Sequence, residues 1–114
     1  MTDIFVFGSN LAGRHGKGAA AFARQHHGAI YGQGYGMQGR SFAIPTKTGD
    51  LQTLPLDEIA RYVGMFKDYA ADHPEYTFYV TPVGCGLAGY RQEQIRPLFA
   101  GMPDNCRFAE TWYL

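Results

Sequence analysis

The chain has 114 residues, which is enough for one domain with a single modest hydrophobic core. Apolar residues make up 46% of it and charged residues 18%, a composition that excludes an intrinsically disordered chain. Ten basic residues balance ten acidic ones, so no bulk nucleic-acid binding is expected, although net charge does not exclude a local basic cluster.

Cysteine usage and the N-terminal sequence suggest a reducing compartment. Cys85 and Cys106 are too few for a disulfide framework, and the N-terminus has neither a basic segment nor a signal cleavage motif. No apolar run approaches membrane-spanning length. We therefore expect a single cytoplasmic domain, residues 1–114, with no membrane contact.

The first half of the chain predicts two buried strands separated by a helix. The apolar run 4–7 is typical of a strand buried on both faces and is followed by a loop over 8–16. The alanine-rich stretch 17–27 predicts a helix that Gly28 would end. A brief strand at 29–31 and an irregular, glycine-rich segment at 32–39 follow, and the run 41–45 predicts a second buried strand ended by Pro45.

The second half predicts a long helix, a strand, a short helix and a final strand. The long helix begins near Pro55 and ends before Pro74, and it has one apolar stripe: Leu56, Ile59, Val63, Phe66 and Ala70. Residues 76–83 predict a strand, 92–99 a short helix and 107–113 a last strand. This alternation predicts an α/β fold with a mostly parallel sheet covered on both faces. Loops that follow its strands should meet at the ligand-binding edge.

The first glycine-rich loop, residues 8–18, is similar in spacing to a phosphate-binding P-loop. Gly8 and Gly13 are correctly spaced after a strand, but Arg14 and His15 stand where a P-loop has Lys and Ser or Thr, which argues against NTP hydrolysis. Free backbone N–H groups and the positive end of a helix would still suit an anion. The alternative is a tight strand-to-helix turn without a ligand.

The middle loop, residues 34–39, fits the string G-x-G-x-x-G but precedes a strand instead of a helix. The context therefore rejects the dinucleotide fingerprint. A flexible flap carrying Tyr35 and Arg40 is one interpretation, and a solvated loop without ligand contacts is the other.

The third loop, residues 83–90, is the most specific signal. Gly84, Gly86 and Gly89 would let the backbone curl around a diphosphate, and Tyr90 could stack on a sugar or base. Cys85 would need an activating base or a helix N-terminus to act as a nucleophile, so a buried structural cysteine is the favoured interpretation.

Among the single polar residues, Lys47 directly follows a predicted strand, so its amine should lie near the other loops. A desolvated lysine can act as a nucleophile or base, whereas a solvated surface lysine does neither. His26 and His27 suit the end of a helix and are interpreted as structural. No set of Cys, His and carboxylate residues has metal-ligand spacing, so we predict no metal and no cofactor.

Three segments resemble the macrodomain superfamily, in particular the branch of terminal ADP-ribose protein glycohydrolases and of antitoxins that remove ADP-ribose from DNA. Residues 83–87 are similar to that branch's second phosphate loop, and residues 43–47 to the strand that ends in its catalytic lysine. More loosely, residues 7–20 are similar to the asparagine-bearing first loop of macrodomains. The resemblance suggests a small phage or bacterial protein.

The resemblance implies a compact three-layer α/β/α domain with ADP-ribose lying across the sheet. The diphosphate would rest between the two outer glycine-rich loops, with Asn10 near the distal ribose and Lys47 attacking its anomeric carbon. Loops and resemblance together predict these ligand contacts: Gly8, Ser9, Asn10, Gly13, Gly16, Gly18, Tyr35, Gly84, Cys85, Gly86, Leu87, Ala88, Gly89 and Tyr90.

The sequence departs from that branch at three points. Ala88 lies where an assisting aspartate would fall, and Asp50, near Lys47 in sequence, is the candidate replacement. The upstream strand whose carboxylate binds the adenine amine in many macrodomains has no counterpart here, and the chain is shorter at its N-terminal end than a typical macrodomain.

Three functions follow from the sequence. The first is a glycohydrolase that removes ADP-ribose from a protein or nucleic acid, with Lys47 as nucleophile. The second is a non-catalytic binder that sequesters ADP-ribose or an NAD-derived nucleotide signal. The third is a protein-interaction module with a vestigial cleft.

Overall fold

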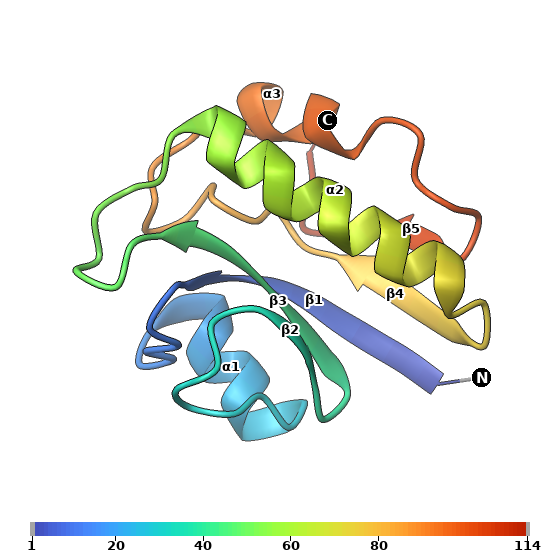
Figure 1. The fold of residues 1–114 in the computed structure, drawn as a ribbon, viewed down its shortest axis with the longest axis horizontal. Coiled ribbons are helices and arrows are strands. Elements are labelled where there is room, and N and C mark those ends of the chain that lie inside the picture. Colours follow the sequence, from blue (N-terminus) through green and yellow to red (C-terminus); the bar gives the residue numbers. More distant parts are fainter. Residues whose placement is uncertain (1, 114) are drawn as a thin grey trace.

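The computed structural model describes residues 2–113 as a five-stranded sheet with helices on both faces (Figure 1). The strands are β1 (Thr2–Asn10), β2 (Gly36–Gln38), β3 (Ser41–Lys47), β4 (Tyr76–Val80) and β5 (Cys106–Phe108). The helices are α1 (Gly18–His26), α2 (Leu56–Asp72) and the short α3 (Gln92–Ile95), which continues into a 3-10 turn, η1 (Arg96–Phe99). The strand order is β2-β3-β1-β4-β5, and only the β2–β3 pair is antiparallel. The predicted three-layer α/β/α class with a mostly parallel sheet is confirmed.

β1 occupies the centre of the sheet and is buried on both faces, as its unbroken apolar run predicts. Ile4 and Val6 pack into the larger core beneath α2, whereas Phe7 packs with Ala20 and Ala23 of α1 on the opposite face. Alanines let α1 lie close to the sheet. The predicted apolar stripe of α2 is confirmed, with Ile59, Val63, Phe66 and Ala70 all buried.

Two strands run further than the sequence predicts. β1 continues past Gly8 to Asn10, and β3 continues past Pro45 to Lys47, because the two pair with each other along this stretch. Pro45 does not end β3, since β2 pairs with β3 only as far as Ala43 and the missing N–H therefore breaks no bond in that ladder. This extension carries Asn10 and Lys47 side by side to the edge of the sheet.

Other expected elements are wrong in place or length. Residues 29–31 form no strand, because the Ile30 amide donates to the Gln38 side chain and not to a neighbouring strand. The segment 32–39, expected to be irregular, contains β2. The last strand is β5 and not 107–113, because Trp112 folds back and donates its indole N–H to the Val80 carbonyl at 2.6 Å.

The strand predicted over 76–83 ends at Val80, where Thr81 turns away and donates its hydroxyl to the Val6 carbonyl at 2.6 Å. The short helix predicted over 92–99 is confirmed as α3 followed by η1. Within residues 2–113, no helix combines the length and the apolar character needed to cross a membrane.

Candidate functional site

A cavity of about 700 Å³ opens where β1, β3 and β4 end. The predicted contacts that line it are Gly8, Ser9, Asn10, Gly16, Gly18, Lys47, Gly84, Gly86, Leu87 and Ala88. The other lining residues are Arg14, Lys17, Ala19, Ala20, Tyr31, Thr46, Leu51, Thr81, Pro82 and Val83. The topology thus brings together the three loops that follow parallel strands, at the edge where α/β folds bind ligands.

Asn10 shapes the first wall of the cavity. Its Oδ1 accepts a hydrogen bond from the Arg14 amide at 2.9 Å, and its Nδ2 donates to the Arg14 carbonyl at 3.1 Å. The buried Asn10 side chain therefore closes the loop over 10–14. It also fixes the backbone of Arg14, which lines the cavity. A polar group used in this way stabilises the loop, whatever its contact with a ligand.

The second element of this wall is the N-terminal end of α1. Lys17 is the N-cap, and in the described chain it makes no side-chain hydrogen bond to the helix, whose first turn carries no acidic residue. The first amides of a helix lack intrahelical acceptors. Gly18, Ala19 and Ala20 all line the cavity, so the positive end of the helix lies at its wall.

The opposite wall is the loop after β4. Two hydrogen bonds close turns within this loop. The Gly89 amide donates to the Gly86 carbonyl at 3.0 Å, and the Tyr90 amide donates to the Gly84 carbonyl at 2.9 Å. In the described part of the chain, the amides of residues 86–88 donate to no acceptor. A side chain at Gly86 would meet no atom within 4 Å, so this part of the loop is open to a ligand.

The charged groups of the cavity are all positive. Arg14, Lys17 and Lys47 line it, and no aspartate or glutamate does among the described lining residues. Asp50 is exposed in the turn over 48–53, does not line the cavity and forms no ion pair with Lys47. The suggestion that Asp50 replaces the family's assisting carboxylate therefore has no support from this geometry.

Three predicted contacts have their side chains elsewhere. The Tyr35 ring packs edge-on against Phe42 in the core beneath α2, and burial is the main cause of its raised pKa. Tyr90 donates its hydroxyl to the Leu54 carbonyl at 2.6 Å. Cys85 contacts the same core, and burial, followed by the charge of a nearby glutamate, raises the pKa of its thiol. The structural interpretation of Cys85 agrees with this placement.

Two predicted glycines shape loops without lining the cavity. Gly13 has φ +69° and abuts the backbone of Gln33, which leaves no room for a side chain. Gly89 has φ +87° and turns the third loop toward α3. Their roles are conformational.

Exposed apolar side chains form a rim at the cavity mouth, and two of them, Tyr31 and Leu51, were not predicted from the sequence. Tyr31 is 57% exposed, and Leu51 and Leu87 are also exposed. Leu51 has a left-handed backbone (φ +66°) at the tip of the turn over 48–53, an uncommon conformation for a branched side chain. The Gly49–Asp50 pair, typical of a tight turn, could have placed Leu51 near Lys47, but no local pattern marks Tyr31.

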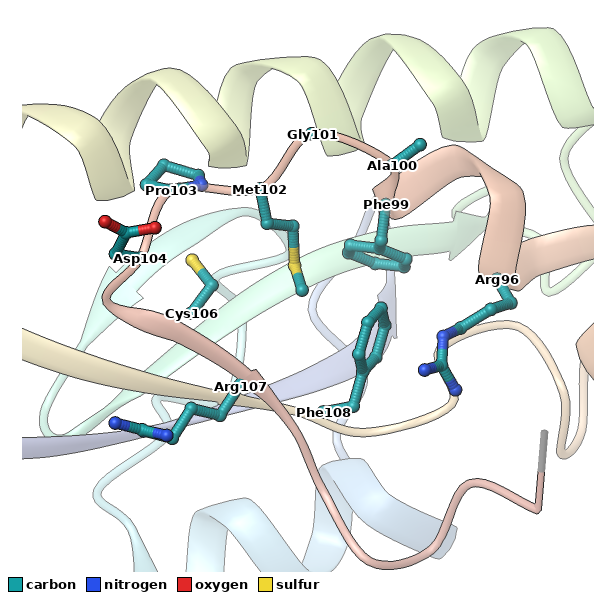
Figure 2. A pocket seen from close by; sticks show the side chains of 10 residues that line it. All are labelled: Arg96, Phe99, Ala100, Gly101, Met102, Pro103, Asp104, Cys106, Arg107 and Phe108. Carbon is teal, nitrogen blue, oxygen red and sulfur yellow. The ribbon is translucent and has the colours of Figure 1, made fainter.

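A second hollow of about 730 Å³ lies between η1, residues 100–104 and β5 (Figure 2). Phe99, Met102 and Phe108 surround its centre, and the Arg107 guanidinium points away from it. The Arg96 guanidinium lies 3.5 Å from the centre of the Phe108 ring, which covers its charge. Asp104 also lines this hollow, whereas the first cavity has three cations and no carboxylate among its described lining residues, so the first cavity is the candidate site for an anion.

No protein-family model matches the sequence, and no curated protein matches it. Among solved structures, one titled a macrodomain protein from Streptomyces coelicolor is similar, with a TM-score of 0.61 over 95% of this chain and 87% of that one. The fold is macrodomain-like. A protein of unknown function from Bacteroides thetaiotaomicron is also similar, with a TM-score of 0.58 over 85% of this chain and 77% of that one. The identities are 16% and 17%, so the similarity concerns the fold and does not single out the glycohydrolase branch.

Within this macrodomain-like fold, the cavity is assembled by backbone more than by side chains. The N-terminal end of α1 and the loop over 86–88 both line it, and the hydroxyls of Ser9, Thr46 and Thr81 are already bonded to backbone carbonyls. Among the described residues, no group of three or more His, Cys, Asp or Glu could hold a metal ion. The cavity thus offers N–H donors and cations, which is chemistry suited to an anionic ligand.

Proposed function

We propose that this cavity binds ADP-ribose or a related nucleotide diphosphate. One observation carries the proposal: the N-terminal end of α1, the loop over 86–88 with its unbonded amides and three cationic side chains line a single cavity, with no carboxylate among the described lining residues. Phosphate oxygens accept hydrogen bonds from such amides and pair with Lys and Arg. A volume of about 700 Å³ is within the range of small-molecule sites.

The apolar rim supports a nucleotide over a free phosphate. Tyr31, Leu51 and Leu87 are exposed at the mouth, where a flat base or a ribose can cover them. An aromatic side chain with one face free is a suitable platform for a base. The cavity thus combines cations and backbone amides with exposed apolar side chains, as a nucleotide combines phosphates with a base.

Calorimetric titration with ADP-ribose, compared with AMP and NAD, tests the proposal on the wild-type protein and on Gly86→Glu. Because the Gly86 position is sterically open, the variant should fold and place a negative charge among the free amides. We expect it to bind ADP-ribose at least about tenfold more weakly, about 1.4 kcal/mol. Gly64→Glu on α2, also sterically open, is the matched control and should bind as the wild type does.

Two results would contradict the proposal. One is equal affinity of Gly86→Glu and the wild type, which would place the ligand elsewhere. The other is no binding of any of the three nucleotides, which would favour a protein-interaction module with a vestigial cleft.

A glycohydrolase is the second candidate, because Lys47 lines the cavity and has no ion pair among the described residues. In that reaction the Lys47 amine would attack the anomeric carbon as the bond to the modified macromolecule breaks, and the leaving group would need a proton. Water would then hydrolyse the bond between Lys47 and the ribose, which releases ADP-ribose and restores the lysine. The described lining residues include no carboxylic acid to supply the leaving group's proton, so binding is the better-supported function.

Lys47→Ala separates the two candidates. A glycohydrolase would lose release of ADP-ribose from ADP-ribosylated protein or DNA while keeping its affinity for free ADP-ribose within a few-fold. Lys67→Ala is the control, since Lys67 lies on α2, does not line the cavity and donates to the Ala100 carbonyl. No release by the wild type would leave a non-catalytic binder.

A further inference from the structure

The tip of the third loop, residues 86–89, has few attachments to the rest of the molecule. The chain is anchored on either side of the tip, because Cys85 contacts the core beneath α2 and Tyr90 donates its hydroxyl to a backbone carbonyl at 2.6 Å. Between these anchors, a single hydrogen bond in the described chain joins the tip to another segment, from the Thr53 hydroxyl to the Ala88 carbonyl at 2.8 Å. Thr53 is therefore the polar tether of the tip.

Thr53 is the last residue of the turn over 48–53, which lies between β3 and α2 (Figure 1). Within this turn the Thr48 amide donates to the Gln52 carbonyl at 2.7 Å, and the Thr48 hydroxyl accepts from the Gln52 amide at 3.1 Å. Lys47 and Thr53 form an antiparallel bridge at its base. Because the turn is closed by its own hydrogen bonds, Thr53 offers its hydroxyl to the third loop from a fixed position.

Packing does little to fix the tip. A Cβ atom built at Gly86 or at Gly89 would meet no atom within 4 Å. The Leu87 side chain lies near the start of α1, since a Cβ atom built at Gly18 would lie 3.8 Å from one of its methyl carbons. The tip thus reaches both the turn over 48–53 and the N-terminal end of α1, and it carries amides that have no acceptor among the described residues.

We propose that Thr53 is a positioning residue for the proposed nucleotide site, on whose existence its role rests. The Thr53 hydroxyl holds the tip beside the N-terminal end of α1, so that one diphosphate can contact both. The single phosphate of AMP can be held by either wall alone. Without the hydroxyl the tip is free, and a ligand that uses it must order it on binding, which lowers affinity. That loss falls mainly on ADP-ribose and leaves AMP nearly unaffected.

The exposure of Thr53 separates this role from a general contribution to stability. Water competes for both partners of an exposed hydrogen bond, so its loss changes the stability of the whole domain little. The local effect is larger, because the tip has no second hydrogen bond to another segment within the described chain. Removing the hydroxyl should therefore loosen the tip while the fold persists.

Calorimetric titration of Thr53→Val with ADP-ribose and with AMP tests the proposal, since valine keeps the shape of threonine and lacks its hydroxyl. We expect the dissociation constant of ADP-ribose to rise roughly three- to tenfold and that of AMP to change by less than about twofold. Thr53→Ser keeps a hydroxyl and should restore wild-type affinity. Thr48→Val is the matched control, because it removes a hydroxyl hydrogen bond that stays within the same turn, and it should bind as the wild type does.

Amide exchange of the ligand-free protein, followed by NMR, gives a readout that needs no ligand. The Gly89 and Tyr90 amides are bonded within the third loop, at 3.0 and 2.9 Å, so their exchange reports opening of the tip. We expect both amides to exchange several-fold faster in Thr53→Val than in the wild type, and at the wild-type rate in Thr53→Ser and Thr48→Val. Urea denaturation checks that the four proteins are folded to the same extent.

The possible failures are distinguishable. Absence of nucleotide binding by the wild-type protein would overturn the proposed function, and the role of Thr53 with it. Binding of ADP-ribose by Thr53→Val and the wild type with equal affinity would overturn the role of Thr53 and leave the proposed function standing. Equal weakening of ADP-ribose and AMP, unchanged exchange at Gly89 and Tyr90, or an equal effect of Thr48→Val would do the same.

Discussion

Four glycines in or beside the loops of the cavity should respond differently to substitution by alanine. The loss of stability at each depends on two separate factors, the backbone φ and the room for a Cβ atom. At Gly13 the backbone has φ +69° and an added Cβ would lie 2.3 Å from the Gln33 nitrogen. At Gly32 the backbone has φ +98° but the space is open. At Gly34 no left-handed φ is present, but the Cβ would lie 2.3 Å from the Asn10 carbonyl oxygen. At Gly16 neither problem exists.

The expected costs of alanine at these positions follow from two separable terms. A left-handed backbone costs a residue with a Cβ about 1–2 kcal/mol. Forcing a methyl group against fixed backbone costs about 1–3 kcal/mol. We therefore expect Gly16→Ala to change the free energy of unfolding by less than about 0.5 kcal/mol. Gly32→Ala should cost about 1–2 kcal/mol, Gly34→Ala about 1–3 kcal/mol, and Gly13→Ala about 2–5 kcal/mol.

Urea denaturation measures these costs, with the single tryptophan, Trp112, as a buried fluorescent reporter. A domain of this size is expected to unfold in one cooperative transition, so the four free energies can be compared directly. The reasoning would be refuted if Gly13→Ala and Gly16→Ala were equally stable. It would also fail if Gly13→Ala cost no more than Gly32→Ala, since crowding would then contribute nothing.

Two further predictions concern the other side of the fold. The Asn105 side chain donates to three carbonyls where α2 ends and β4 begins, so Asn105→Ala should cost about 1–3 kcal/mol on urea denaturation. Asn105→Asp should cost more, because its carboxylate would face those carbonyls and the negative end of α2; equal stability of the two variants would contradict this. Burial raises the pKa of the Cys106 thiol to about 11, so Cys106 should react with iodoacetamide at pH 8 about a hundredfold more slowly than an ordinary thiol, as measured by mass spectrometry of its peptide.

The sequence predicts best where one local pattern agrees with the tertiary environment. α2 has a clear apolar stripe, a proline before it and acidic residues in its first turn, and the structure confirms it. The strand-to-loop-to-helix pattern also places the first and third loops at one edge of the sheet. Both inferences depend on the spacing of apolar residues and on the order of strands, loops and helices along the chain. Both of these features can be seen in the sequence alone.

The sequence fails where pairing between distant segments decides the outcome. Tyr31 and Tyr35 both lie in glycine-rich surroundings, and one interpretation of the sequence placed Tyr35 on a flexible flap. β2 forms only because Gly36–Gln38 pairs with β3, and this pairing places Tyr35 against Phe42 and away from the cavity. Tyr31 has no strand partner and its ring is exposed at the cavity mouth. No local propensity distinguishes these two outcomes.

Charge separation explains how a chain without net charge could still hold an anion. All three cations of the cavity come from the first 47 residues, whereas the facing wall, residues 81–88, contributes amides and no charged side chain. An acidic residue on either wall would cancel a cation at short range, where Coulomb interactions are strongest. The acidic residues lie almost entirely beyond position 49. The positive potential at the cationic wall is therefore not offset by a carboxylate in the same segment, although the net charge of the chain is zero. The composition alone conceals this arrangement, and the order of the residues along the chain reveals it.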